Sequence, residues 1–345
     1  MRRGLARFLN HRRPEGDMRA SLSGRLFSFV LGMGLFGWLM FSAPAGAHTP
    51  QSAGPAAVPA AHLPWITRDY SFRLARVNAY RLLAALPALT DNPDWSAGAA
   101  LHARYMVKTN QPTNYEEPTL YPDYFTTQGA EAAANSLLIF TDTVTFSEDE
   151  AVRFWMRSPF QALSLLDAEL RQTGFGSYRE ADGGLQMAAA LDVRRGWQAG
   201  APAGVAYPVM WPAAGKTVDL RTYSGQDYPD PLAAPFCQAD YRGLPILVQL
   251  GDGSRAVRLA DIAPTVLLSS GGPLSHCAFS ETEYPPNPND GDYGKILLDT
   301  RDAVVLMPQS PLAAGQTYTV TVQAMVDNIP VAYTWSFHVA PDAGP

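Results

Sequence analysis

Residues 147–170, SEDEAVRFWMRSPFQALSLLDAEL, decide the fold of the region around them. Ser147 and Glu150 have the spacing of a capping box, which predicts a helix that begins after Ser147. Ser158 followed by Pro159 is typical of an N-cap and a first helical residue, so a second helix is expected at once. Leucines at helical spacing form the predicted core face of that helix: Leu163, Leu166 and Leu170.

Upstream of this stretch, the apolar spacing predicts two further helices. The first begins near Tyr70 and ends before Pro87, and the second covers 91–108. The first has its apolar residues on one face: Leu74, Val77, Tyr80 and Ala84. Residues 111–145 are expected to form a long irregular connection with one short helix at 130–137, and such connections often carry function.

Downstream of the helices the pattern becomes strand-like. Two strands are predicted at 174–178 and 185–193, around a glycine-containing turn. Beyond Gly196 the chain is first rich in Pro, Ala and Gly and then contains only short runs typical of strands. These runs are 244–250, 256–259, 265–268, 295–298, 303–307, 317–324 and 333–339. Seven short strands separated by turns predict a β-sandwich.

The N-terminus has the pattern of a secretory signal. A basic stretch precedes an uncharged apolar run, which ends in Ala45-Gly46-Ala47. Residues 1–47 are therefore interpreted as a signal peptide, and an uncleaved membrane anchor is the alternative because the run approaches the length of a membrane span. Residues 48–66 read as a tether. The expected location is extracellular or in the cell envelope.

The net charge bears on the possible partners, and the two cysteines bear on disulfide and zinc chemistry. Removal of residues 1–47 leaves 19 of 26 basic and 30 of 32 acidic residues, a net charge of −11, which disfavours nucleic acid. In an exported chain, Cys237 and Cys277 are expected to form one disulfide, with two free thiols as the alternative. Neither cysteine lies in a zinc-binding motif.

Five segments between residues 77 and 176 together resemble the CAP domain (SCP-like, cysteine-rich secretory/antigen 5/pathogenesis-related) of the bacterial branch. They are Val77-Asn78-Ala79-Tyr80-Arg81, Leu101-His102-Ala103-Arg104-Tyr105-Met106, the run from Ala151 to Phe160, Leu165-Leu166-Asp167 and Gly174-Phe175-Gly176. They occur in the family order over roughly 110 residues. The resemblance implies an α+β fold, a three-layer α-β-α sandwich.

The family's cleft typically holds a divalent cation with two His and two acidic residues, and this chain departs from that tetrad. By the resemblance, the two His positions fall on Asn114 and Gln161, and the acidic positions on Ala134 and Ser158. Neutral amides bind transition metals poorly. We therefore expect no metal and no cofactor.

Other polar residues near the presumed cleft leave a catalytic alternative open. Glu117 or Glu131 could act as an acid or base with His102, as in a cell-wall or peptide hydrolase. Glu116 or Glu117 could also act as an acid or base with a second carboxylate such as Glu131. In the simpler interpretation, the glutamates are exposed to solvent and His102 is a core residue. The aromatic residues of the loop either line a ligand groove or pack onto the sheet: Tyr115, Tyr121, Tyr124 and Phe125.

The C-terminal part shows a second resemblance. Pro311-Leu312, Tyr318-Thr319-Val320 and Trp335-Ser336-Phe337 look like the end of a bacterial Ig-like domain. The predicted organisation is a CAP domain at 67–200, a linker at 201–216 and an Ig-like β-sandwich at 217–340.

From these observations we expect an exported, non-enzymatic binding module. Its cleft would be lined by Asn114, Tyr115, Glu117, Ser158 and Gln161. The ligand would be an extracellular protein, lipid or cell-wall component, and the chain would contact a membrane only through an uncleaved N-terminal segment. Hydrolysis and lipid or sterol binding are the alternatives.

Overall fold

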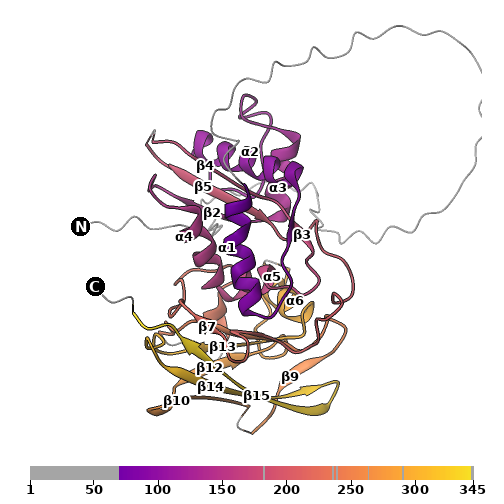
Figure 1. Cartoon of the computed structure of the whole chain (residues 1–345). Coiled ribbons are helices and arrows are strands. Elements are labelled where there is room, and N and C mark those ends of the chain that lie inside the picture. The colour runs from indigo at the N-terminus through magenta and orange to yellow at the C-terminus, as the bar shows by residue number, and fades with distance from the viewer. Residues whose placement is uncertain are drawn as a thin grey trace, which may run out of the picture. The chain divides into compact units, whose positions relative to one another are not determined.

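The computed structural model describes residues 70–181, 183–234, 237, 240–262, 264–289 and 291–342, which all fall within one compact unit. The predicted signal peptide and tether lie outside these residues. Figure 1 shows the order of the elements along the chain.

The first region combines helices with a small antiparallel sheet. Its elements are α1 (Tyr70–Leu83), β1 (Thr90–Asp91), α2 (Pro93–Thr109), α3 (Thr127–Asn135), β2 (Ser136–Thr141), α4 (Glu148–Met156), α5 (Pro159–Leu165), β3 (Gln172–Thr173), β4 (Phe175–Arg179) and β5 (Met187–Asp192). The strands β2, β5 and β4 pair in that order, and β1 pairs separately with β3 in parallel. The four main helices predicted from the sequence are confirmed to within two or three residues at their starts.

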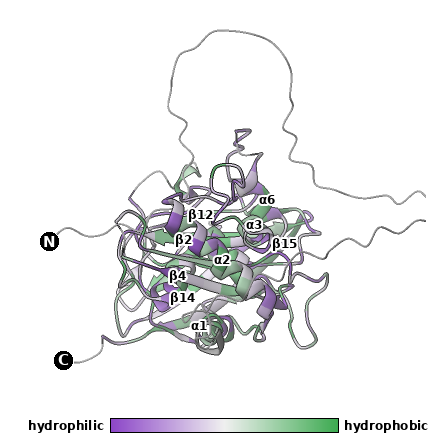
Figure 2. Cartoon of the chain, turned by 90° about the horizontal axis from the view of Figure 1, so that it is seen from above, coloured by the Kyte–Doolittle hydropathy of each residue, from purple (hydrophilic) through white to green (hydrophobic). Residues whose placement is uncertain are grey.

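The sheet separates two helical layers, because its side chains alternate between its faces. On β5, Met187, Ala189 and Leu191 pack with α1, α4 and α5, while Ala188 and Ala190 pack against α2 and α3. All five are fully buried. The result is the predicted α-β-α arrangement, with α2 packed on β4 and β5; Figure 2 looks down on the molecule with α2 near the centre.

The second region is rich in β-structure. It contains β6 (Val209–Trp211), β7 (Thr217–Val218), the 3-10 helix η1 (Pro231–Ala233), β8 (Ile246–Gln249), β9 (Val257–Leu259), β10 (Thr265–Ser269), β11 (Gly272–Pro273), β12 (His276–Phe279), α6 (Tyr293–Asp299), β13 (Ala303–Pro308), β14 (Thr317–Val326) and β15 (Ile329–Val339). One sheet has the order β12-β13-β8-β6, and the other has β11-β10-β14-β15-β7 with β9 also on β14. All pairs are antiparallel except β15–β7.

Several elements differ from the sequence prediction. The helix expected to carry Leu163, Leu166 and Leu170 ends at Leu165, so Leu166 and Leu170 pack into the core from beyond its end. The strand β12 was also missed. Residues 295–298 were expected to form a strand and instead lie in α6, so that prediction was wrong. Leu297 and Leu298 pack into the core from this helix, which contacts α5 and β13. The strand β2 follows α3 without a turn and was missed, and β6 lies within the predicted linker and pairs with β8.

The two regions share one hydrophobic core and are joined by buried polar contacts. Gln249 on β8 donates from Nε2 to the carbonyl oxygen of Leu166 at 2.8 Å. Arg301 forms an ion pair with Asp167 at 2.9 Å, and both side chains are about nine-tenths buried. The β-rich region therefore completes the core behind α5.

The predicted disulfide is confirmed. Cys237 and Cys277 are bonded, both are buried, and their Cα atoms lie 5.4 Å apart. The bond ties Cys237, which follows η1 in the sequence, to Cys277 on β12 across 40 residues. Closing a loop of this length restricts the unfolded chain by about 4 kcal/mol in the chain-entropy account.

Candidate functional site

His102 lies on the buried face of α2 and is bonded through both ring nitrogens. Its Nδ1 is 3.1 Å from Oε1 of Glu116, and its Nε2 is 2.9 Å from the carbonyl oxygen of Thr113. The side chains of His102 and Glu116 are both fully buried. The catalytic partners considered in the sequence were Glu117 and Glu131, and neither is among the hydrogen-bond partners of His102 in the described chain.

The geometry fixes how many protons the His102–Glu116 pair holds. A carbonyl oxygen can only accept, so Nε2 of His102 carries a hydrogen. Nδ1 then faces a carboxyl oxygen, and a hydrogen bond there needs a proton on either Nδ1 or Glu116. The pair is thus an imidazolium with a carboxylate, or a neutral imidazole with a carboxylic acid, and it is neutral overall in both cases.

Glu116 also anchors the start of α3. Its Oε2 accepts from the backbone N–H of Thr126 at 2.9 Å, and the hydroxyl of Thr126 caps α3 by accepting from Gly129 at 2.9 Å. A Cβ at Gly129 would lie 2.2 Å from Oε1 of Glu116, so only glycine fits there. One carboxylate thereby links α2, segment 111–126 and α3.

Tyr105 supports the same segment one turn further along α2. Its hydroxyl accepts from the backbone N–H of Glu117 at 2.9 Å, and its ring meets Tyr121 edge-on at 5.8 Å between centroids. Next to it, the guanidinium of Arg104 lies 5.3 Å from the ring centre of Tyr124. Segment 111–126 is therefore held against α2 at several points.

Of the residues predicted to bind, Asn114, Tyr115 and Glu117 lie on the outer side of segment 111–126, where Leu120 is also exposed. Tyr115 is 56% exposed, Leu120 is 71% exposed, and Asn114 is also exposed. Glu117 is half-buried and accepts from the backbone and the hydroxyl of Thr119, and these bonds hold the pKa of Glu117 below its usual value. This carboxylate stays ionised at neutral pH.

The remaining glutamate and the aligned alanine have arginine partners on the surface. Glu131 is exposed and lies 3.5 Å from Arg195, and Arg194 donates to the carbonyl oxygen of Ala134 at 3.3 Å. Within the described residues, the hydrogen-bond partners of His102 are Glu116 and Thr113, and neither Glu131 nor Ala134 is among them.

Ser158 and Gln161 lie in a different environment from Asn114. Both are buried, at the start of α5, where residues 224–227 of the second region cover them. Oγ of Ser158 is 2.7 Å from Oγ of Ser224 and 3.0 Å from the carbonyl oxygen of Gln226. Oε1 of Gln161 is buried and has no hydrogen-bond partner in the described chain.

The N-terminus of α5 is capped by Asp227, not by the residue before the helix. Ser158 occupies the N-cap position but makes no capping bond, whereas Oδ2 of Asp227 accepts from the backbone N–H of Phe160 at 2.8 Å. Burial raises the pKa of the Asp227 carboxyl well above its ordinary value, against the lowering effect of the N–H groups of Phe160, Tyr228 and Gln161. The second region thus supplies a cap that α5 lacks.

The described residues contain neither a metal-binding cluster nor a membrane-spanning helix. No group of three or more His, Cys, Asp or Glu side chains in this part of the chain could hold a metal ion. Within the same residues, none of the helices has the length and apolar character needed to cross a membrane.

A family comparison agrees with the layered helical fold. Residues 74–189 match the family model described as CAP, the cysteine-rich secretory protein family, and this region is a CAP domain. The match covers about a third of the chain and ends before the β-rich region. No curated protein matches the chain.

Two functional features were not predicted from the sequence. The pairing of His102 with Glu116, 14 residues away, could have been suspected from a buried-face histidine next to an acidic loop. The cap by Asp227 is 67 residues from Phe160 and has no local signal.

Proposed function

We propose that the chain is an exported, non-catalytic binding protein whose CAP domain contacts its partner through segment 111–126. The observation that supports this most directly is that the residues at the four metal-binding positions of the family do not share one cleft. Ser158 and Gln161 are buried beneath residues 224–227, whereas Asn114 is exposed on segment 111–126. In this proposal Asn114, Tyr115 and Glu117 remain binding groups, and Ser158 and Gln161 hold the two regions together.

Export is supported by the buried disulfide, which is typical of oxidising compartments, and by the secretory character in the family's description. The proposed location is extracellular or in the cell envelope, with residues 1–47 as the signal and the uncleaved anchor as the alternative.

The exposed chemistry of segment 111–126 favours a protein partner. Tyr115 and Leu120 offer apolar contact area, and Glu117 adds a carboxylate that stays ionised. Carboxylates repel anionic lipid headgroups, and the net negative charge of the chain also disfavours nucleic acid. Lipid, sterol and cell-wall ligands are less well supported, so vesicles of phosphatidylserine should not deplete the protein from solution.

A hydrolase is supported less well than a binding protein. A general base must reach the proton that it removes, directly or through one water. His102 is fully buried and is occupied at both ring nitrogens. Catalysis through Glu117 or Glu131 with His102 would require segment 111–126 to leave α2.

For the second region we propose an Ig-like sandwich that supports the CAP domain. Tyr318 stacks on Phe337 at 5.6 Å between ring centroids, and both lie in the core shared by the two sheets. These are residues of the segments that resemble the end of a bacterial Ig-like domain.

Metal content is the test of the proposal. The purified full chain, stripped with EDTA and equilibrated with micromolar Zn²⁺, should retain far less than one zinc per chain by mass spectrometry. The double variant Asn114→Ala/Gln161→Ala should retain the same trace amount. Stoichiometric zinc in the wild type, lost in this variant, would overturn the proposal.

A further inference from the structure

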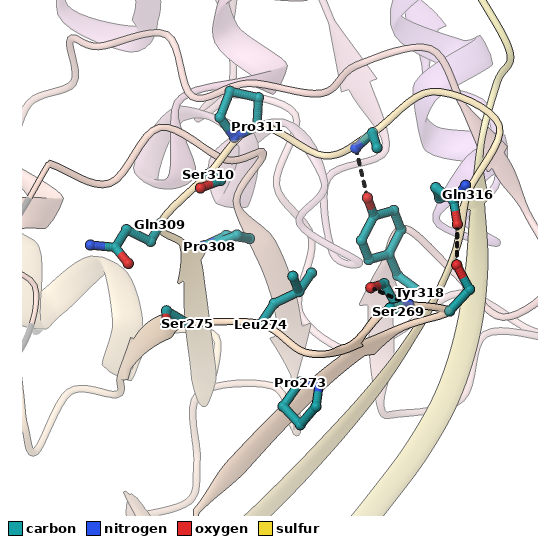
Figure 3. Close-up of a pocket in the computed structure, with 13 residues that line it drawn as sticks. Ser269, Pro273, Leu274, Ser275, Pro308, Gln309, Ser310, Pro311, Gln316 and Tyr318 are labelled. Carbon is teal, nitrogen blue, oxygen red and sulfur yellow. Dashed lines mark hydrogen bonds between the residues drawn. The ribbon is translucent and has the colours of Figure 1, made fainter.

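A hollow of about 510 Å³ lies in the second region, away from segment 111–126. One side is formed by the connection from β10 through β11 to β12, and the other by the residues that follow β13 and begin β14. Figure 3 shows Leu274 and Ser275 on one side and Gln309, Ser310 and Pro311 on the other. The volume lies in the range of small-molecule binding sites.

The two sides of the hollow are fixed by their own hydrogen bonds. Tyr318 accepts from the backbone N–H of Ala313 at 2.6 Å, and Ser270 donates to the amide oxygen of Gln316 at 2.6 Å (Figure 3). The backbone N–H of Gln309 donates to the carbonyl oxygen of Ser275 at 2.9 Å and joins one side to the other. The hollow is therefore formed before any ligand arrives, which lowers the entropic cost of binding.

Three polar side chains at the hollow do not take part in the hydrogen bonds that fix its sides. In the part of the chain that the structure describes, the side chains of Ser275, Gln309 and Ser310 make no hydrogen bond, and all three residues are exposed. Together they offer two hydroxyls and one carboxamide, each able to donate and accept.

The lining also restricts the charge of the ligand. None of its 13 residues has a charged side chain. An ionic ligand would find no counter-charge here, and a wholly apolar ligand would leave the hydroxyls and the amide unpaired. The apolar surface comes mainly from Leu274 and the rings of Pro273, Pro308 and Pro311. Flat apolar faces beside neutral donors and acceptors match the C–H faces and hydroxyls of a sugar ring.

We propose that this hollow is a binding site for an uncharged oligosaccharide. It is separate from segment 111–126, so it would give the protein a second ligand, held by the β-rich region. With only neutral hydrogen bonds and small apolar faces, the affinity should be weak, about millimolar.

The test is saturation-transfer NMR of the full chain with two neutral probes, maltohexaose and the hexamer of N-acetylglucosamine. At least one probe should receive saturation, and Gln309→Ala/Ser310→Ala should weaken its binding about tenfold, as expected for two lost hydrogen bonds. Gln198→Ala, the same substitution at an exposed glutamine of the first region, should bind like the wild type.

Ser275→Trp gives an independent check, because an exposed serine can be enlarged without disturbing the core and the indole would fill the hollow. It should abolish the transfer while unfolding at the wild-type temperature. The proposal is overturned if neither sugar receives saturation at millimolar concentration, or if the transfer survives in both hollow variants. A proline-rich peptide that binds at the hollow when the sugars do not would equally overturn it.

Discussion

At the scale of single residues, the buried His102–Glu116 pair makes the sharpest prediction. Glu116→Ala removes the partner of Nδ1 of His102, which is buried, and the acceptor for the N–H of Thr126, which is partly buried. Two unpaired polar groups should cost about 2–4 kcal/mol of unfolding free energy, measured by urea titration. Glu116→Gln should cost less than about 1 kcal/mol, because its amide can donate to a neutral imidazole while its oxygen still accepts from Thr126.

The matched control is Glu117→Ala, one residue along and half-buried, with an expected change within about 0.5 kcal/mol. If Glu116→Gln is as damaging as Glu116→Ala, a carboxamide cannot replace the carboxyl group in its two hydrogen bonds to His102 and Thr126. If Glu116→Ala is harmless, the pair does not hold segment 111–126 in place.

At the scale of elements, the strand β9 is held on one side by glutamate side chains. Glu281 accepts from the backbone N–H of Val257 at 2.6 Å, and Glu283 accepts from that of Leu259 at 3.1 Å. Burial raises the pKa of Glu281 to about 7 from an ordinary 4.5, with Asp299 and Asp302 adding to the shift. Between about pH 4.5 and pH 7, Glu281 therefore stays protonated in the folded protein, whereas it is ionised in the unfolded chain.

This shift gives a pH dependence of known sign. The stabilising effect of the retained proton is complete below about pH 4.5 and is lost as the pH rises through about 7. Glu281→Gln keeps an acceptor for Val257 and cannot ionise, so its stability relative to the wild type should increase between about pH 5 and pH 8. The gain should be about 1 kcal/mol, since Glu281 is partly exposed and solvent weakens its interactions. Thermal unfolding across this range measures it, with Glu131→Gln as the exposed control. A difference that stays constant with pH would contradict the assigned shift.

The elements also show how far sequence reasoning reaches. The capping box of Ser147 and Glu150 is local, and the start of α4 was predicted from it and confirmed. The run 295–298 is too short to distinguish strand from helix by periodicity, and packing of Leu297 and Leu298 beside α5 decides for the helix. The cap of α5 and the cover over Gln161 come from residues that the fold brings in from a distance, which no local pattern encodes.

At the scale of the whole molecule, the shared core and the cap by Asp227 predict that the two regions unfold together. Full-length protein should show one cooperative transition in urea by both tryptophan fluorescence and circular dichroism. Asp227→Ala removes the acceptor for the N–H groups of Phe160, Gln161 and Tyr228, the first two in buried residues. It should lower the unfolding free energy by about 2–4 kcal/mol.

The part of the protein that Asp227→Ala destabilises shows whether the two regions fold as one unit or independently. Asp227 lies in the second region, yet amide exchange should accelerate in both α5 and β8, because Gln249 on β8 also bonds to the end of α5 at Leu166. Asp240→Ala, in an exposed ion pair with Arg242, should change the unfolding free energy by less than about 0.5 kcal/mol. Two separate transitions, with only the second region affected by Asp227→Ala, would mean that the CAP domain is stable without its β-rich neighbour. The burial of Ser158 and Gln161 would then be a contact between two domains that fold independently, and their removal from metal chemistry would rest on the substitutions alone.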